Sequence, residues 1–421
     1  MLTQKILTRL EKESTNAAST TGNGNILQSI MSRDIEYIHM PIKNEYEYFE
    51  QGKTGYCWLS STLFCISQYL KYNHGIEYTA FSKSYLIFYD KLEKANYFLD
   101  LIIKYATYDM RDRNVLYILN NTMTDKGQWN MARNLILKYG MVPYDCMPDN
   151  TSQISTRELN ACFNYLLKCH AINIRKMCKK SVDKHIVYEE KERALQQIYK
   201  LLIMCFGVPP RKVDIPKEFE EIFIQMSPKD FFDIYIKFPF ENYISTCCIG
   251  DNYYVNYKID LDGNVAEGYR NKFLSLPEKI FDSVIKEQIN TEHFCWYSCD
   301  AGKFYIKELS LFDDNPFDLK RIMGDSSYKF FNRKEIFQHH IASPTHAMVF
   351  IDEVQKKDKM FYISYDSSKK SFLGPYCCVS DTWYKNYVFQ AVVNKVCLSK
   401  EVDSTKIYTK KVKPWDFFYM G

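Results

Sequence analysis

The segment from Gln51 to Trp58 constrains this chain more than any other part of its sequence. It reads Gln-Gly-Lys-Thr-Gly-Tyr-Cys-Trp, so a turn that contains glycine leads directly to a cysteine. The residues after Cys57 place apolar side chains along one face of a helix, namely Leu59, Leu63, Ile66 and Leu70. The thiol of Cys57 is therefore predicted to lie at a helix N-terminus, where the helix dipole favours thiolate. A nucleophilic cysteine needs that bias, because an isolated thiol is mostly protonated at neutral pH.

Gln51 is the second candidate residue of this segment, six positions before Cys57. Its side-chain amide is expected to turn back toward the thiol. There it would join the backbone N–H of Cys57 in donating hydrogen bonds to a developing oxyanion. Taken alone, a cysteine after a glycine turn is weak evidence for catalysis, since most buried cysteines are simply small hydrophobic residues. Both interpretations stay open until a partner base is identified.

The composition is that of an ordinary globular protein, with 46% hydrophobic and 25% charged residues. A length of 421 residues predicts two or three subdomains, because one hydrophobic core seldom serves so long a chain. The net charge of +4 neither requires nor excludes nucleic acid, which usually calls for a concentrated basic face. The sequence contains no P-loop and no GxGxxG motif, so nucleotide chemistry has no support.

The N-terminal region indicates a cytoplasmic location. Residues 1–16 are predicted to form a short amphipathic helix and residues 17–25 a flexible link. This region lacks the apolar core of a secretory signal, and Glu11 and Glu13 argue against a transit peptide. No stretch of the chain approaches the roughly 18 apolar residues of a membrane span, so no membrane association is expected.

The remaining cysteines and histidines give no support for a metal centre or another cofactor. The chain has 14 cysteines but no Cys-x-x-Cys motif, and the adjacent pairs Cys247-Cys248 and Cys377-Cys378 suit neither zinc nor ordinary disulfides. His339-His340 lacks a third ligand at a fixed spacing. We therefore expect no metal and no cofactor.

His346 has the setting that a general base requires. It follows Pro344, which favours a turn, and it precedes the apolar stretch from Ala347 to Val354, which predicts a buried strand. A histidine at the start of a core strand is held firmly, as proton transfer demands. The residues alone leave a structural role for His346 open, and the other seven histidines are interpreted as surface or packing residues.

Together these features resemble a known family. The pattern Gln-Gly-x-x-Gly-x-Cys-Trp resembles the nucleophile signature of papain-like cysteine peptidases, and the rest of the chain resembles their bleomycin hydrolase, or aminopeptidase C, branch. The matching blocks keep that family's order over roughly residues 40 to 421. They are Phe81–Leu86, Tyr89–Glu93, Tyr97–Leu99, Gly127–Met131, Lys138–Pro143, Cys299–Lys303, Thr345–Met348 and Pro414–Asp416.

The resemblance implies a cysteine aminopeptidase in which Cys57 is the nucleophile and His346 its acid and base. The pair would rest largely as thiolate and imidazolium, with Gln51 and the Cys57 amide holding the oxyanion. The family carries Glu-Asn-Ser-Trp-Gly after the next strand, whereas this chain has Tyr365 followed by Asp366-Ser367-Ser368. Asp366 thus takes the position of the asparagine that orients the histidine.

The departure at this position has two expected consequences. A carboxylate at residue 366 can still accept a hydrogen bond from the imidazole and stabilises imidazolium more strongly than an amide does. Ser368 replaces the tryptophan that shields the hydrogen bond in the family, so water is expected to reach that bond and weaken it.

The resemblance also implies how substrates are bound and how the protein assembles. Family members place their own C-terminus in the cleft, which leaves room for only the first residue of a peptide with a free N-terminus. Gly421, Met420 and Trp129 are accordingly expected to bind substrate. The same resemblance implies peptide substrates and a homohexameric ring whose active sites face an enclosed channel.

The expected fold class is α+β, a papain-like peptidase fold with a helical half, an antiparallel sheet half and a helical insertion. Helical patterns cover residues 59–140 and 153–206, and the second run is interrupted by the basic stretch Arg175–Lys180. Strand patterns follow at Tyr253–Ile259, Ala347–Val354, Phe361–Tyr365 and Cys377–Val379. The predicted organisation is an N-terminal arm (1–40), the helical half with the nucleophile (41–150), the insertion or oligomerisation region (151–240) and the sheet-rich half with the C-terminal tail (241–421).

Two functions of different classes remain compatible with the sequence. The first is the cysteine aminopeptidase. The second is a catalytically impaired oligomeric binding protein that kept the peptidase fold, which the residues Asp366 and Ser368 favour. Its ligand could be nucleic acid held by the basic stretch Arg175–Lys180, although that stretch is more readily interpreted as a solvated helix face and loop, and the net charge is small.

Overall fold

The computed structural model describes residues 51–52, 54–149, 156–250, 252–314, 331–368, 374–399, 402–403 and 407–416. The predicted N-terminal arm (1–40) and the predicted substrate-binding residues Met420 and Gly421 lie outside these ranges. Within the described parts of the chain, no helix combines the length and the apolar character needed to cross a bilayer.

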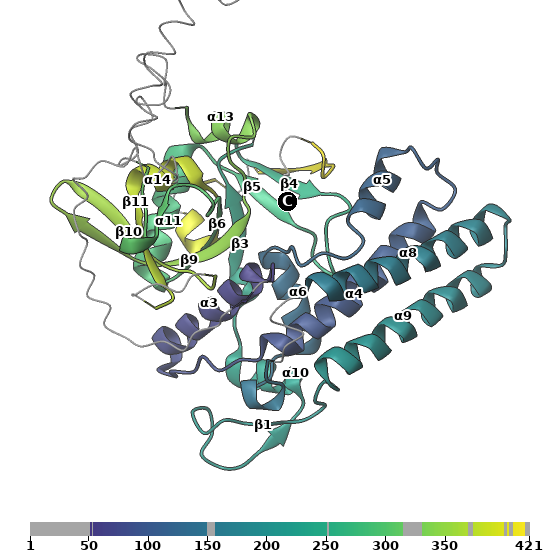
Figure 1. Cartoon of the computed structure of the whole chain (residues 1–421). Coiled ribbons are helices and arrows are strands. Elements are labelled where there is room, and N and C mark those ends of the chain that lie inside the picture. The colour runs from purple at the N-terminus through teal and green to yellow at the C-terminus, as the bar shows by residue number, and fades with distance from the viewer. Residues whose placement is uncertain are drawn as a thin grey trace, which may run out of the picture.

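Helices and strands separate into two lobes, with α3 between them (Figure 1). The first lobe holds the helices predicted over residues 59–140 and those of the insertion. The helices of the described residues are α3 (Cys57–His74), α4 (Lys83–Lys104), α5 (Arg113–Asn120), α6 (Trp129–Tyr139), η1 (Tyr144–Cys146), α8 (Arg157–Lys179), α9 (Lys184–Phe206), α10 (Pro228–Phe231), η2 (Phe232–Ile236), η3 (Phe240–Asn242), α11 (Glu278–Glu292), η4 (Lys307–Leu309), α13 (Arg333–Gln338), α14 (Asp381–Tyr387) and α15 (Lys395–Ser399).

The α3 helix carries the candidate nucleophile into the centre of the molecule. It ends at Gly75, whose left-handed backbone (φ 68°) allows its N–H to satisfy the last carbonyls of the helix. Leu63, Ile66 and Leu70 are completely buried, as their helical spacing predicts. The helix packs on β9 along one side and on α6 along another, so it joins the helical lobe to the sheet.

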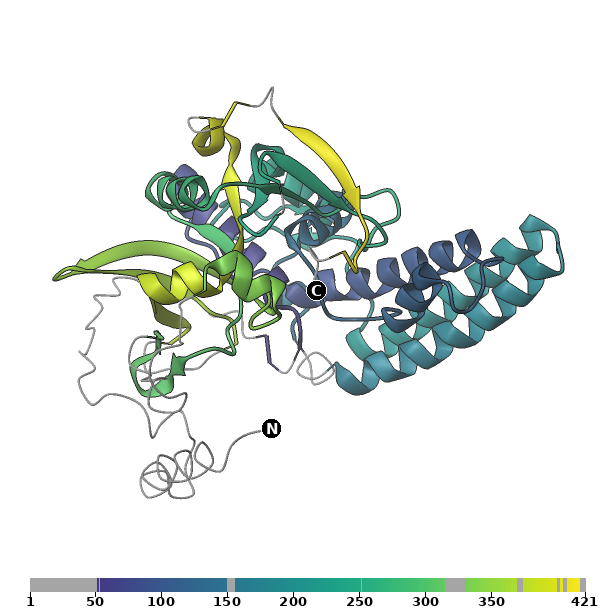
Figure 2. The same cartoon turned by 90° about the horizontal axis from the view of Figure 1, so that it is seen from above.

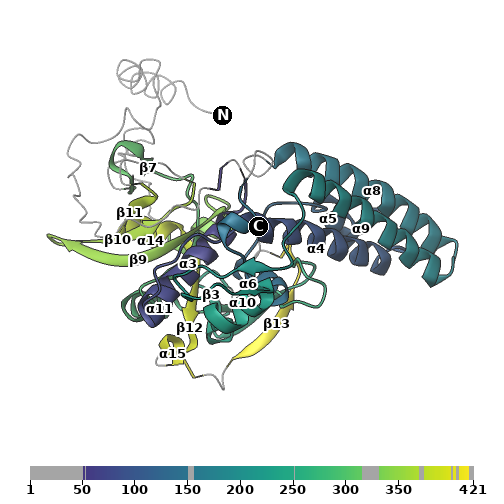
Figure 3. The same ribbon diagram turned by 90° about the horizontal axis from the view of Figure 1, so that it is seen from below.

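The insertion forms a long antiparallel pair of helices, α8 and α9, which packs on α4 (Figures 2 and 3). Phe163 and Leu167 of α8 belong to the same hydrophobic cluster as Leu63 of α3, so the insertion shares a core with the helical half. The predicted interruption at the basic stretch is wrong, because α8 continues to Lys179. Arg175 is buried there and donates hydrogen bonds to the carbonyls of Tyr105 (2.8 Å) and Tyr108 (2.6 Å), which compensate the loss of water around its charge.

The second lobe is built on a mixed sheet in the order β13-β4-β5-β3-β12-β6-β9-β10-β11-β8-β7. Three of its pairings are parallel, β13 with β4, β3 with β5 and β11 with β8, while the others are antiparallel, as expected for this half. A separate hairpin, β1–β2, follows α9. The strands are β1 (Val213–Asp214), β2 (Gln225–Met226), β3 (Tyr243–Cys247), β4 (Val255–Ile259), β5 (Lys272–Ser275), β6 (Cys295–Cys299), β7 (Tyr305–Ile306), β8 (Leu311–Phe312), β9 (His346–Lys356), β10 (Lys359–Tyr365), β11 (Tyr376–Ser380), β12 (Val388–Asn394) and β13 (Tyr408–Val412).

The strands predicted near the site correspond to β9, β10 and β11. The strand predicted at Tyr253–Ile259 corresponds to β4, which begins two residues later than predicted. Tyr254 has a φ of 61°, a left-handed conformation that cannot continue a strand, and β4 therefore starts at Val255.

Strand β9 divides the interior into two hydrophobic cores. Its side chains alternate, so that Ala347 and Val349 join the core shared with the helical lobe, whereas Met348 and Phe350 join the core beneath the sheet. Over residues 347–350 each core thus holds every second residue of the strand. The first residue of β9, His346, is fixed at the boundary between the lobes.

Candidate active site

The start of α3 and the start of β9 bring Cys57 and His346 together. The thiol and the imidazole are hydrogen-bonded to each other. The backbone N–H of Ala347 also points at Cys57, 3.4 Å from its Sγ. Cys57 is the first residue of α3, so its own amide has no acceptor inside the helix and can serve a ligand.

Asp366 completes a line of three polar side chains. It follows β10, and its Oδ1 lies 2.8 Å from Nε2 of His346, which leaves Nδ1 of the imidazole for Cys57. The backbone N–H of Ser368 (2.8 Å) and its hydroxyl (2.7 Å) donate to the same oxygen. Asp366 is 1% exposed, whereas the side chain of His346, at the other end of the hydrogen bond, is 10% exposed. Ser368 stands at the position of the shielding tryptophan that the resemblance implies, and its two hydrogen bonds hold the carboxylate in place.

The charges of these three residues support one another. Burial of the Cys57 thiol favours its neutral form, but the facing His346 imidazolium and the Ala347 N–H outweigh burial and lower the pKa of Cys57. Burial likewise favours neutral imidazole, yet the charges of Cys57 and Asp366 raise the pKa of His346 to about 10. The pKa of Asp366 is lowered, because His346 outweighs the effect of burial. Both pKa shifts act in the direction that favours a thiolate at Cys57 and an imidazolium at His346.

Gln51 is held beside this triad by hydrogen bonds at both ends of its amide. Its Oε1 accepts from the hydroxyl of Ser367 (2.8 Å), and its Nε2 donates to the carbonyl of Thr54 (3.0 Å). The backbone N–H of Gln51 donates to the carbonyl of Ser367 (3.2 Å). An amide nitrogen carries two hydrogens, so one remains for an oxyanion.

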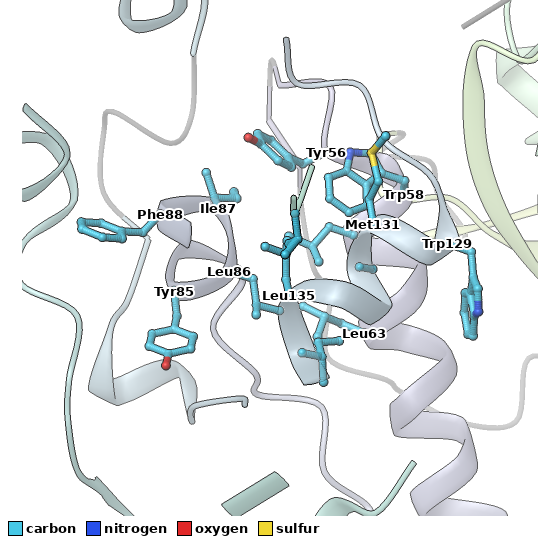
Figure 4. Packing of buried hydrophobic residues seen from close by; sticks show 14 of the residues in the cluster. Tyr56, Trp58, Leu63, Tyr85, Leu86, Ile87, Phe88, Trp129, Met131 and Leu135 are labelled. Carbon is cyan, nitrogen blue, oxygen red and sulfur yellow. The ribbon is translucent and has the colours of Figure 1, made fainter. Parts of the chain in front are cut away.

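Sequence reasoning missed an ion pair that contacts Gly55 and Trp58, on either side of the nucleophile in the chain. Nζ of Lys91, whose side chain is fully buried, contacts Oδ1 of Asp125 at 2.5 Å. Asp125 Oδ2 accepts from the N–H of Gly55 (3.4 Å), and the Asp125 carbonyl accepts from Nε1 of Trp58 (2.8 Å). Figure 4 shows Tyr56 and Trp58, the neighbours of Cys57, among the buried side chains of α3, α4 and α6. In the sequence, the only local signal for Asp125 was its position two residues before the Gly127–Met131 block.

Trp129, the remaining predicted substrate contact within the described chain, does not lie on an exposed surface. It is 1% exposed, and its ring packs on Phe238, Phe240 and Trp296 with centroid separations of 5.9, 5.6 and 6.4 Å. The structure contradicts a substrate contact for this side chain, whose bulk serves the core at the start of α6. Among the residues that the structure describes, no three His, Cys, Asp or Glu side chains cluster as metal ligands.

Comparison with known proteins extends the likeness over almost the whole chain. The profile of the Peptidase C1-like family matches residues 9–419. Aminopeptidase C of Listeria monocytogenes is 30% identical over 377 residues, which cover 87% of this chain and 84% of that protein. The bleomycin hydrolase of Rattus norvegicus is 27% identical over 373 residues, covering 84% and 81%. The crystal structure of PepW from Lactobacillus rhamnosis has a TM-score of 0.86 at 22% identity and covers 99% of this chain and 98% of that one.

These matches bear on the fold and on the class of protein. The likeness to the PepW structure, together with the family match, confirms the predicted α+β papain-like fold. The family match and the curated relatives confirm the predicted class, a cysteine-type peptidase related to aminopeptidase C and bleomycin hydrolase. This chain belongs to the Peptidase C1-like family.

Proposed function

We propose that this protein is a cysteine aminopeptidase that removes single residues from the free N-termini of peptides. The observation that carries the proposal is the hydrogen-bonded line from Cys57 through His346 to Asp366. The names of its relatives, aminopeptidase C and bleomycin hydrolase, supply the choice of an aminopeptidase over an endopeptidase. We further propose that it works in the cytoplasm, where thiols stay reduced; the structure joins none of the 14 cysteines in a disulfide.

The reaction follows from the positions of the side chains. The Cys57 thiolate attacks the carbonyl carbon, the new C–S bond forms, and the carbonyl electrons move to oxygen. Gln51 Nε2 and the Cys57 N–H stabilise that oxyanion. Imidazolium His346 then gives the proton on Nδ1 to the leaving amine as the C–N bond breaks. In the second half, His346 removes a proton from water, which attacks the acyl group and releases the thiolate.

We propose that the residues after Asp416, including Met420 and Gly421, limit the cleft to one substrate residue. Contacts within the described chain support a route for these residues toward the nucleophile. Trp415 packs against Tyr117 (5.9 Å between centroids) and under Arg113 (5.0 Å), which fixes the start of the tail on α5. Tyr117 lines a cavity that extends to Gly127. Gly127 lies so close to Trp58 that a Cβ there would come within 2.3 Å of the indole, so this cavity ends beside the nucleophile helix.

Substrates with free and with acetylated N-termini test this proposal. The full chain is expected to hydrolyse aminoacyl-aminomethylcoumarins but not their N-acetylated forms, because the tail fills the space that an acetyl group or a preceding residue needs. A chain that ends at Asp416 is expected to hydrolyse both. Initial rates from fluorescence measure the effect. Hydrolysis of acetylated substrates by the full chain would indicate an endopeptidase, and turnover of neither substrate would favour the binding protein.

We propose in addition that the protein self-associates as a homohexamer. Large apolar side chains are exposed near the end of α9 and in the β1–β2 hairpin, where Met204 is 73%, Ile222 70% and Phe223 73% exposed. Light scattering after size exclusion is expected to give about 300 kDa, six copies of the 50.0 kDa chain. A mass near that of one chain would contradict the assembly and leave the peptidase proposal standing.

A further inference from the structure

We propose that Ser61 is a positioning residue, which holds His346 against Cys57 by binding the backbone of Ala347. The inference deepens the proposed peptidase function and rests on it. Ser61 is completely buried, and its hydroxyl donates to the carbonyl oxygen of Ala347 at 3.0 Å. Ala347 directly follows His346 in the chain, so a bond to its backbone fixes the histidine as well.

Both polar groups of the Ala347 backbone are bound by α3. Its N–H points at Cys57 Sγ (3.4 Å), and its C=O accepts from Ser61 (3.0 Å). Cys57 and Ser61 are four residues apart, which places them on the same face of the helix, one turn apart. One side of α3 therefore binds the N–H and the C=O of a single residue of β9, and the nucleophile Cys57 forms one of these two contacts.

The sheet explains why Ala347 is available to α3. The pairing of β9 with β6 continues to His346 and Cys299, but the pairing of β9 with β10 ends at Val349 and Tyr365. In an antiparallel strand the N–H and C=O of one residue point to the same side. On the β10 side of Ala347 the hydrogen bonds between strands have therefore ended. A buried N–H and C=O without partners there would destabilise the fold. Cys57 and Ser61 take the place of the missing strand.

A second bond ties the same turn of α3 to the sheet. Nε1 of Trp296, in β6, donates to the carbonyl oxygen of Trp58 at 3.3 Å. Trp296 is buried, like Ser61. The two bonds run in opposite directions, one from helix to strand and one from strand to helix. They leave the start of α3 little freedom to slide along β9, which is the motion that would separate Cys57 from His346.

Ser60 is a matched control for Ser61. It is the preceding residue of the same helix and is completely buried, and its Oγ has no hydrogen-bond partner among the described residues. Replacing either serine with alanine removes one buried hydroxyl from α3. The two variants differ in that only Ser61→Ala breaks the bond to Ala347.

The experiment compares Ser61→Ala and Ser60→Ala in the full chain by two readouts. The first is the rate of Cys57 alkylation by iodoacetamide as a function of pH, resolved by mass spectrometry of the Cys57 peptide. We expect Ser61→Ala to move the midpoint of that profile to higher pH, because a displaced His346 and Ala347 stabilise the thiolate less. We expect the midpoint of Ser60→Ala to stay at the wild-type value. Loss of stability alone would not move this midpoint.

The second readout is hydrolysis of an aminoacyl-aminomethylcoumarin. Ser61→Ala is expected to lower kcat about tenfold with little change in KM, since small displacements of reacting groups cost rate rather than binding. Equal midpoints and equal kcat in the two variants would overturn the role of Ser61. The alkylation profile decides the matter even if the wild-type chain hydrolyses no substrate, a result that would count against the proposed function alone.

Discussion

Cys57→Ala is expected to abolish peptide hydrolysis while the protein keeps its fold. The thiolate of Cys57 is the only protein group in the proposed mechanism that forms a bond to substrate carbon, and alanine has no atom that can replace it. We expect kcat/KM to fall by at least about 10⁴-fold, as for other enzymes that lose a member of a nucleophile–base unit. Because alanine is close to cysteine in size, the circular dichroism spectrum and the melting temperature are expected to change little.

Cys65→Ala is the matched control for this variant. Cys65 lies two turns further along α3 and is completely buried, and burial raises its pKa well above the usual range for a thiol, so it carries no nucleophilic charge. Its replacement is expected to leave kcat/KM within about threefold of wild type, since removal of a buried thiol there touches only packing. Equal losses in the two variants would show that the helix, and not the thiolate, accounts for the effect. Retention of activity in Cys57→Ala would refute the mechanism.

Asp366→Asn is expected to move the alkaline limb of the pH–rate profile to lower pH. The active form contains imidazolium His346, which is lost as pH rises through its pKa of about 10. Burial works against that high value, and the negative charges of Cys57 and Asp366 produce it. An amide at residue 366 removes one of the two charges but can still accept from Nε2 of the imidazole. The pKa of His346 therefore falls, and the active ion pair is lost at a lower pH than in wild type.

Asp366→Ala separates the charge from the hydrogen bond. Alanine removes both, so His346 loses its orientation as well as its counter-charge, and kcat/KM at pH 7 is expected to fall by about 10²- to 10⁴-fold. Asp366→Asn is expected to retain much more activity at that pH, because the amide still orients the ring. Profiles of kcat/KM between pH 4 and 11 measure both effects. An alkaline limb at the same pH in wild type and Asp366→Asn would mean that the carboxylate does not set the charge of His346.

The aspartate at residue 366 thus gives this chain a variant of the family's asparagine site with a built-in negative charge. Ser368 supports it, since its N–H and hydroxyl both donate to the carboxylate oxygen that binds His346. The residue pattern that raised the alternative of an impaired binding protein gives Oδ1 of this buried carboxylate three hydrogen-bond partners, the imidazole of His346 and the N–H and hydroxyl of Ser368.

The sequence by itself determined the elements that carry the site. The helical spacing of apolar residues after Cys57 predicted α3, and the apolar run after His346 predicted β9, because burial on one face imposes a period on the chain. The residues of the family resemblance predicted Asp366 as the partner of His346. These inferences depend on local patterns, and local patterns specify which face of an element is buried.

Only the tertiary structure decided what covers each face. Ser367 binds Gln51 across 316 residues and Ser61 binds Ala347 across 286, and no period in the sequence links such positions. The same limit explains two errors. Trp129 was expected to contact a ligand and Arg175 to lie on a solvated helix face, but neighbouring elements enclose both side chains. A pattern shows that a side chain needs a partner, whereas the packing of distant segments determines which partner it has.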